Sequence, residues 1–208
     1  MDKKTKIAVF VSGGGTNLQA LIDAEKSGII TSGEISLVIS DKADAYALER
    51  AKNNDIKTAV VLKKKGEQAD FEARLMSALT GNNIEMIILA GFMCILSADF
   101  TSKWPKRIIN VHPSLIPSFC GKGAYGLHVH EMALDYGVKV TGATVHFVNE
   151  VPDGGEIIFQ KAVNIEDGDT PEVLQRRVME QAEWLLLPAA AEKVAKDIAE
   201  KGESYGHL

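Results

Sequence analysis

The sequence of 208 residues contains few cysteines, prolines and aromatic residues. Its two cysteines, Cys94 and Cys120, make neither a disulfide framework nor a zinc-ligand pattern. No apolar run approaches the length of a membrane span, and the run at residues 7–11 is too short for a signal peptide. These absences predict a cytoplasmic protein with free thiols and no membrane segment.

The sequence also lacks an excess of positive charge. It has 23 Lys and Arg residues against 28 Asp and Glu residues, which gives a net charge of -5. This balance argues against a broad nucleic-acid-binding surface but leaves room for a local phosphate site. With 46% apolar and 25% charged residues, the chain has an ordinary globular composition. Its length suits one domain, or one domain with a substantial extension. A monomer and a homodimer are both expected possibilities.

Short apolar segments alternate with helical patterns along the chain. Parallel strands are expected at residues 6–11, 34–40, 58–62, 84–90 and 108–112, and an antiparallel hairpin at 138–148 and 157–163. This order predicts a single α/β domain over residues 1–208, with a doubly wound, mostly parallel, Rossmann-like sheet that a C-terminal antiparallel hairpin extends.

Two of the predicted helices have clear end signals. The helix at residues 127–136 is closed by Gly137. The last helix begins with Thr170 as its cap and Pro171 at its first position. It is expected to bend or break before Pro188 and to resume as far as residue 199.

A glycine-rich loop follows the first predicted strand. Ser12-Gly-Gly-Gly-Thr-Asn17 lies between a strand and a helix, an arrangement that surrounds a phosphate with backbone amides and a helix N-terminus. Leu18 stands where a dinucleotide fingerprint needs a glycine, and the lysine of a P-loop is absent. The loop therefore indicates either a phosphate site outside these two motifs or a tight turn without a ligand.

Asn110 and His112 lie at the end of the fifth predicted strand. Residues two apart in a strand share a face, so the amide and the imidazole project to the same side. Pro113 keeps His112 extended, and the exit of a parallel strand is where open α/β sheets place their chemistry. A structural role for both side chains, with backbone partners, is the alternative.

Asp153 adds a carboxylate on the hairpin loop, although Asp153-Gly154 is also a strong turn signal. An amide and an imidazole can hold an oxyanion while a carboxylate accepts a proton from an attacking amine. The three residues therefore suit direct transfer of an acyl group to an amine. His128 and His130 do not share a helix face, so no metal site is expected.

Asn110-x-His112-Pro-Ser-Leu-x-Pro117, with the later Asp153-Gly-Gly, resembles the catalytic pattern of formyltransferases that use 10-formyltetrahydrofolate. Ser12-Gly-Gly-Gly-Thr-Asn-Leu-Gln19 and Leu89-Ala-Gly-Phe-Met-x-Ile-Leu-Ser97 narrow the resemblance to members that formylate glycinamide ribonucleotide in purine biosynthesis. The resemblance covers nearly the whole chain. It implies two small-molecule substrates, no metal, no nucleic acid and no membrane.

The resemblance also implies a role for each matching position. Asn110, His112 and Asp153 match the catalytic residues, with Thr144 and His146 beneath Asp153. The substrate-binding positions are Gly15, Thr16, Asn17 and Glu183. The folate-binding positions are Met93, Cys94, Ile95, Leu96, Asn149, Glu150, Val151 and Pro152. Residues 1–100 then form a phosphate-binding half, and residues 101–208 a catalytic and folate-binding half.

Two departures from the family pattern affect these expectations. Cys94 stands where many relatives have an arginine that contacts the folate, and Cys120 stands in a lengthened loop where relatives often have a proline. Two other functions use part of the pattern. A formyltetrahydrofolate hydrolase shares the three catalytic residues, and a non-catalytic nucleotide-binding module would explain only the glycine loop.

Overall fold

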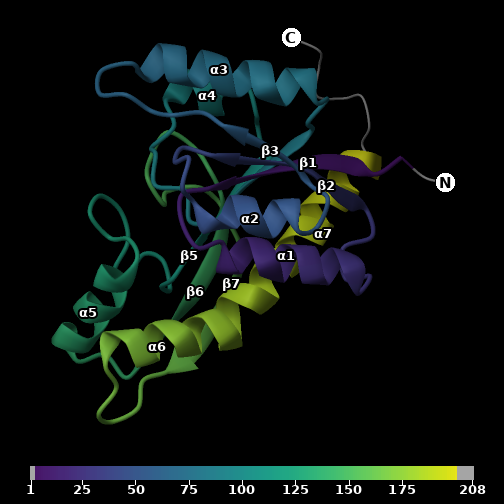
Figure 1. The fold of residues 1–208 in the computed structure, drawn as a ribbon. Helices are drawn as coiled ribbons and strands as arrows, with labels where there is room; N and C mark the ends of the chain where they lie inside the picture. Colours follow the sequence, from purple (N-terminus) through teal and green to yellow (C-terminus); the bar gives the residue numbers. More distant parts are fainter. Residues whose placement is uncertain (1–2, 201–208) are drawn as a thin grey trace.

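The computed structural model describes residues 3–200 and contains one seven-stranded sheet in the order β3-β2-β1-β4-β5-β6-β7 (Figure 1). The strands are β1 (Thr5–Val11), β2 (Gly33–Ser40), β3 (Lys57–Val60), β4 (Met86–Leu89), β5 (Ile108–His112), β6 (Val140–Phe147) and β7 (Ile157–Asn164). Strands β1 to β5 pair in parallel, whereas β6 and β7 are antiparallel to their neighbours. The predicted sheet, including its C-terminal hairpin, is confirmed.

Helices cover both faces of the sheet. They are α1 (Thr16–Lys26), α2 (Tyr46–Lys52), α3 (Gln68–Gly81), α4 (Ala98–Thr101), α5 (Leu127–Tyr136), α6 (Pro171–Val178), the π-helical turn η1 (Met179–Glu183) and α7 (Trp184–Glu200). Helices α1, α2 and α7 pack on one face, and α3 and α4 on the other (Figure 1). The bounds of α5 are those predicted, because Gly137 adopts φ 80° and ends the helix.

The two faces have separate apolar cores. Val9 and Phe10 are neighbours on β1 and are both fully buried. Successive strand residues point to opposite faces, so Val9 packs in the core of α1 and α7 while Phe10 packs beneath α3. Each such side chain contributes about 1.5–3 kcal/mol by leaving water. A central strand covered on both sides therefore needs an almost continuous apolar sequence, as β1 has.

The C-terminal helices differ from the prediction at one point. Thr170 caps α6 as expected, by accepting a hydrogen bond from the Val173 N–H. Of the predicted bend or break before Pro188, the break is wrong, because Pro188 lies inside α7. The interruption comes earlier, at η1. Pro188 cannot donate to the carbonyl four residues earlier, at Trp184, which is where η1 passes into α7, so the missing bond falls at an existing irregularity.

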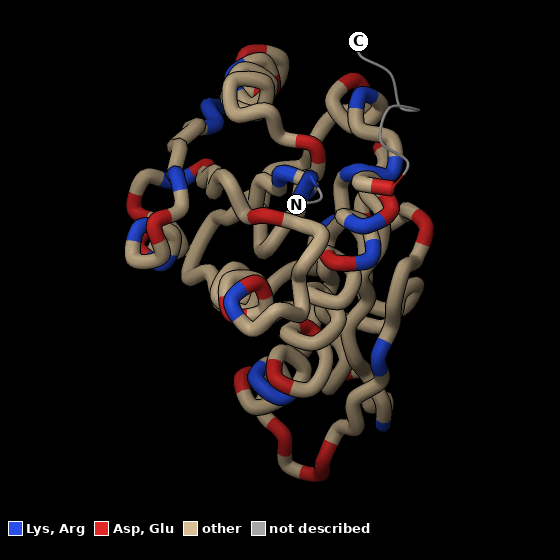
Figure 2. The backbone as a smooth tube through the Cα atoms, turned by 90° about the vertical axis from the view of Figure 1, so that its right-hand side faces the viewer, with Lys and Arg blue, Asp and Glu red and all other residues tan. Residues whose placement is uncertain are grey.

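The parallel strands place the glycine loop after β1, residues 90–97 after β4 and His112 at the end of β5 along one edge of the sheet. In the view of Figure 2, Lys and Arg segments are interspersed with Asp and Glu segments. Within residues 3–200, no helix has both the length and the apolar character to cross a membrane.

Candidate active site

Asn110 and His112 lie on β5 opposite residues of β6. Asn110 is paired with His146, and His112 with Thr144. The Asn110 amide nitrogen is 3.2 Å from His146 Nε2, and His146 Nδ1 is 2.8 Å from the Phe147 carbonyl oxygen. His146 Nδ1 therefore donates to this carbonyl, and the Asn110 amide directs one of its N–H groups towards the Nε2 side of the ring. One of the two Asn110 N–H groups is used in this way, which leaves the second for a ligand.

Asp153 lies between two imidazoles. Its Oδ2 is 3.6 Å from His112 Nδ1, and its Oδ1 is 3.6 Å from His146 Nε2. These distances exceed hydrogen-bond length, so both contacts are electrostatic. The Gly121 N–H donates to Oδ2 over 2.9 Å. Asp153 itself adopts φ 56°, which the turn of the hairpin loop requires.

The surroundings of Asp153 keep it ionised. Burial by itself raises the pKa of this carboxyl. The contact with His146, the Gly121 N–H and the charge of His112 together outweigh burial, and the pKa lies below its ordinary value. Asp153 is consequently a carboxylate at neutral pH, in the state needed to accept a proton.

His112 is held by the loop that follows it. The side chain is buried, and its Nε2 lies 2.9 Å from the Phe119 carbonyl oxygen. Since Nδ1 faces Asp153, both ring nitrogens face oxygen acceptors. Phe119 adopts φ 50°, an uncommon conformation outside glycine. These partners of His112 and Asp153 are backbone groups of residues 119 and 121, for which the sequence carries no signal.

Thr144 supports the loop after β5. Its hydroxyl is fully buried, donates to the Ser114 carbonyl over 2.7 Å and accepts from the Ile116 N–H at 3.1 Å. The Gln160 amide donates to the same oxygen over 2.9 Å. Thr144, on β6, thus stabilises the turn that follows His112. Gln160, on β7, was not predicted.

The glycine loop is built against α2. Gly15 precedes α1 with φ 73°, and a Cβ atom there would lie 2.6 Å from the Ala47 Cβ. Glycine is therefore required at residue 15 both by its conformation and by the close approach of α2. Thr16 is exposed at the start of α1. The first N–H groups of this helix have no partner within it, as a phosphate site needs.

Asn17 contacts Glu183 instead of facing the loop. Its amide donates to the Glu183 carboxylate over 2.7 Å, and its Oδ1 is buried without a donor among the described residues. Glu183 is only 6% exposed and lies in η1. Burial raises the pKa of Glu183 to about 6, while the bond from Asn17 acts in the opposite direction. The side chain of Asn17 thereby ties α1 to the C-terminal helices.

The predicted folate-binding segment after β4 presents two side chains outward. Met93 is 49% exposed and Ile95 is 60% exposed. The Met93 N–H donates to the Ser12 hydroxyl over 2.8 Å, which joins this segment to the glycine loop. Leu96, in contrast, is buried in the core beneath α3, so only its backbone can take part in a site.

Cys94 donates its thiol proton to an Asp41 carboxylate oxygen over 3.3 Å. Burial and Asp41 together raise the pKa of the Cys94 thiol to about 12. Cys94 is therefore an uncharged thiol at neutral pH. It supplies no charge to a ligand.

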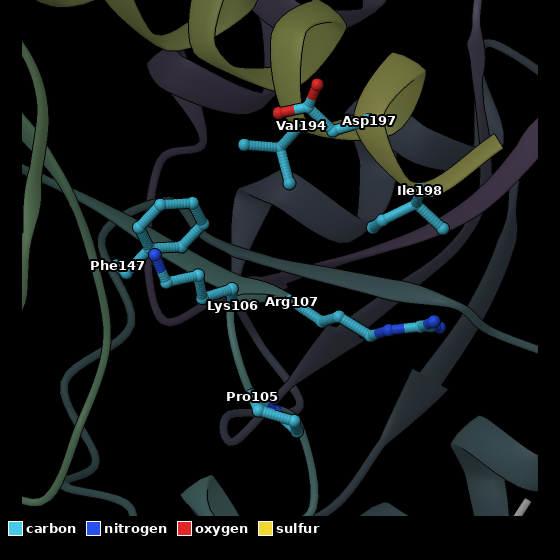
Figure 3. Close-up of a pocket in the computed structure, with 7 residues that line it drawn as sticks. All are labelled: Pro105, Lys106, Arg107, Phe147, Val194, Asp197 and Ile198. Atoms are coloured by element: carbon cyan, nitrogen blue, oxygen red, sulfur yellow. The ribbon is translucent and has the colours of Figure 1, made fainter. Parts of the chain in front are cut away.

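The second predicted folate-binding segment follows β6. The Asn149 side chain accepts from the Val151 N–H over 2.9 Å, and Glu150, Val151 and Pro152 are exposed. Asn149 and Glu150 border a groove against α4, which also involves Thr101. An adjoining pocket, drawn in Figure 3, is formed by residues that lead into β5, by Phe147 and by α7. That pocket contains none of the predicted site residues.

His128 and His130 do not act together. His130 is 1% exposed, whereas His128 is exposed and lies 2.9 Å from a Glu131 carboxylate oxygen. Within residues 3–200 no group of three or more His, Cys, Asp or Glu side chains is arranged to hold a metal ion.

The fold and site together define a class of enzyme: an α/β protein whose sheet edge brings an amide, an imidazole and an ionised carboxylate beside a glycine loop. The sequence profile of the formyl transferase family matches residues 5–190. The chain belongs to the formyl transferase family.

Comparison with individual proteins points to particular members of this family. Over 184 residues, 88% of this chain and 84% of the relative, the chain is 42% identical to phosphoribosylglycinamide formyltransferase of Haemophilus influenzae. It is 46% identical over 202 residues to the trifunctional purine biosynthetic protein adenosine-3 of Gallus gallus, but spans only 19% of that protein's length. The structure of glycinamide ribonucleotide transformylase 1 from Symbiobacterium toebii is similar, with a TM-score of 0.86, 39% identity and coverage of 93% of this chain and 89% of that one.

Proposed function

We propose that this chain transfers the formyl group of 10-formyltetrahydrofolate to the amine of glycinamide ribonucleotide in de novo purine biosynthesis. The observation that carries the proposal is the position of the Asp153 carboxylate, 3.6 Å from His112 on one side and 3.6 Å from His146 on the other. His146 in turn bonds Asn110. Membership of the formyl transferase family and the names of its relatives support the same reaction.

In the proposed mechanism the acceptor amine attacks the formyl carbon directly. Negative charge then develops on the formyl oxygen, where the second Asn110 N–H donates to it. The positive charge of a protonated His112, whose ring nitrogens face Phe119 and Asp153, stabilises this oxygen electrostatically. Asp153 accepts the proton that the amine loses, directly or through a water molecule. When the intermediate collapses, the bond from the formyl carbon to the folate nitrogen breaks and that nitrogen takes up a proton. The products are the formylated amine and tetrahydrofolate.

The two substrates are assigned to different parts of the sheet edge. We assign the phosphate of the acceptor to the backbone N–H groups of Gly15, Thr16 and Asn17. We assign the ribose of the acceptor to the Glu183 side chain. The folate is assigned to residues 93–96 and 149–152. The outward side chains of Met93 and Ile95 and the groove beside Asn149 supply an apolar surface with polar groups at its border, as a flat ligand needs.

We extend the proposal to the organisation of the chain. Residues 1–208 would form one domain, with the phosphate-binding half at 1–100 and the catalytic and folate-binding half at 101–208. Residues 1–2 and 201–208 lie outside the described part of the chain. Both cysteines are free, which suits the reducing cytoplasm that we propose as its compartment.

An absorbance assay of folate product formation tests the function. Purified protein is mixed with 10-formyltetrahydrofolate and either glycinamide ribonucleotide, initiator methionyl-tRNA or buffer alone. We expect rapid product formation only with glycinamide ribonucleotide. Equal turnover in buffer alone would identify a hydrolase, and no turnover with any acceptor would favour a nucleotide-binding module.

A further inference from the structure

Two carbonyl groups of the glycine loop are occupied by α2. The Ala47 N–H donates to the Gly13 carbonyl over 3.0 Å, and Arg50 Nε donates to the Gly14 carbonyl over 2.8 Å. Helix α2 lies alongside α1 and the loop before it (Figure 1). Helix α2 therefore holds the glycine loop from one side, through the carbonyl groups of the loop.

This contact determines where the donors of the loop point. Both peptide bonds are trans, and in a trans peptide the carbonyl and the following N–H point in opposite directions. Since the carbonyls of Gly13 and Gly14 face α2, the N–H groups of Gly14 and Gly15 face away from it. Neither N–H has a hydrogen-bond partner within residues 3–200. Together with the first N–H groups of α1, they form a concave set of donors suited to an anion.

Arg50 is itself held in place. Its Nη1 donates to the Gln19 side chain over 3.2 Å, and its guanidinium lies 5.1 Å from the centre of the Tyr46 ring. A Cβ atom on Gly15 would lie 3.4 Å from the Arg50 Cδ, so the side chain passes directly beside the loop. Residues of both α1 and α2 thus position a cation whose Nε contacts the loop backbone.

We propose that Arg50 is a positioning residue that orients the Gly13-Gly14 and Gly14-Gly15 peptides for the phosphate of the acceptor. Its bond to the Gly14 carbonyl turns the Gly15 N–H towards the ligand, and its charge favours an anion there. Arg50 lies on the side of the loop away from the donors and does not touch the reacting atoms. This inference rests on the proposed function, which supplies the phosphate-bearing acceptor.

The test compares Arg50→Met with the wild-type chain. The KM for glycinamide ribonucleotide should rise roughly ten- to a hundredfold, as expected for one charge-assisted hydrogen bond. The kcat and the KM for the folate should stay within about twofold, because phosphate binding acts equally on ground state and transition state. Arg50→Lys keeps the charge and a donor, so it should recover part of the loss.

Two further variants complete the design. Gln19→Ala removes an acceptor of Arg50 and should raise the same KM to an intermediate extent. Arg74→Met is the matched control, since Arg74 also bonds a backbone carbonyl, that of Leu62, but lies on α3 across the sheet. It should behave as wild type. Wild-type constants in both Arg50→Met and Gln19→Ala would overturn the inference.

A titration without turnover separates this inference from the proposed function. Ribose 5-phosphate, which carries a phosphate monoester, is titrated calorimetrically into the wild type and each variant. If Arg50→Met binds ribose 5-phosphate more weakly than wild type and Arg74→Met does not, the inference is supported, whether or not glycinamide ribonucleotide is the acceptor. Equal affinity in all variants, with normal formyl transfer by the wild type, would overturn the inference and leave the proposed function standing.

Discussion

The Asn17 amide donates to the Glu183 carboxylate over 2.7 Å and joins two residues separated by 166 positions in the sequence. Asn17 belongs to the first turn of α1, directly after the glycine loop, and Glu183 to the π-helical turn before α7. The bond places a buried carboxylate at the helix that follows the glycine loop. That carboxylate is costly to ionise, since burial raises its pKa to about 6.

Glu183→Gln is expected to stabilise the fold at neutral pH. The folded pKa of about 6 lies above the ordinary 4.5, so the folded chain binds the proton more tightly than the unfolded chain. The contribution of Glu183 to the free energy of unfolding is therefore most favourable below pH 4.5 and is lost as the pH rises through 6. The difference corresponds to about 2 kcal/mol in the free energy of unfolding.

Urea unfolding at pH 7.5 and pH 4.5 checks this prediction. The variant should gain stability at the higher pH and lose the advantage at the lower one. The KM for glycinamide ribonucleotide should rise at the same time, because the amide is a weaker acceptor than the carboxylate for the proposed ribose hydroxyl groups. A variant that is less stable than wild type at pH 7.5 would contradict the argument from burial.

Asp153→Asn and His112→Ala should lower kcat by roughly a hundredfold or more each, with both substrates still bound. The double variant should lose far less than the product of the two, because the residues act as a unit. Steady-state kinetics and equilibrium titrations provide the measurement. Asp167→Asn, at a fully exposed position, is the control, and a near-normal kcat for Asp153→Asn would return that residue to a purely structural turn role.

Thr144→Val and Thr141→Val form a matched pair on β6. The Thr144 hydroxyl has three hydrogen-bond partners: the Ser114 carbonyl, the Ile116 N–H and the Gln160 side-chain amide. The Thr141 hydroxyl is buried with none among the described residues. Thr144→Val should cost roughly 1–3 kcal/mol and lower kcat, since its partners are left unpaired. Thr141→Val should be neutral or stabilising. Thermal unfolding of both variants decides the point, and equal losses would contradict it.

Gly15→Ala should destabilise the fold by two separable effects. The positive φ costs about 1–2 kcal/mol for any other residue, and the new methyl group would overlap the Ala47 Cβ. Combining it with Ala47→Gly should remove the overlap with the Ala47 Cβ, but the Ala47 Cα would still lie 2.9 Å from the new methyl group and the backbone cost would remain, so rescue should be partial. Gly14→Ala is the control, because a Cβ there meets nothing within 4 Å. Full rescue, or none, in an unfolding experiment would contradict this division.

Local patterns were sufficient to predict most of the fold. Every strand of the sheet lies near its expected position, because buried strands are short apolar runs and the hairpin alternates in character. The bounds of α5 followed from Gly137 and the start of α6 from Thr170 and Pro171, since caps depend on the residue itself. The shared face of Asn110 and His112 likewise follows from the two-residue period of a strand.

By itself, then, the sequence determined the order and type of the elements, the strand that carries Asn110 and His112, and the resemblance to a formyltransferase. The tertiary structure alone decided that Asp153 lies between two imidazoles, that Ala47 packs too closely on Gly15 for a side chain there, and that the helical interruption falls at η1 instead of Pro188. Caps and strand periods act between neighbours in the chain. These other features depend on contacts between distant segments and on backbone N–H and carbonyl groups, which every residue type carries alike and whose directions arise only when the helices pack on the sheet.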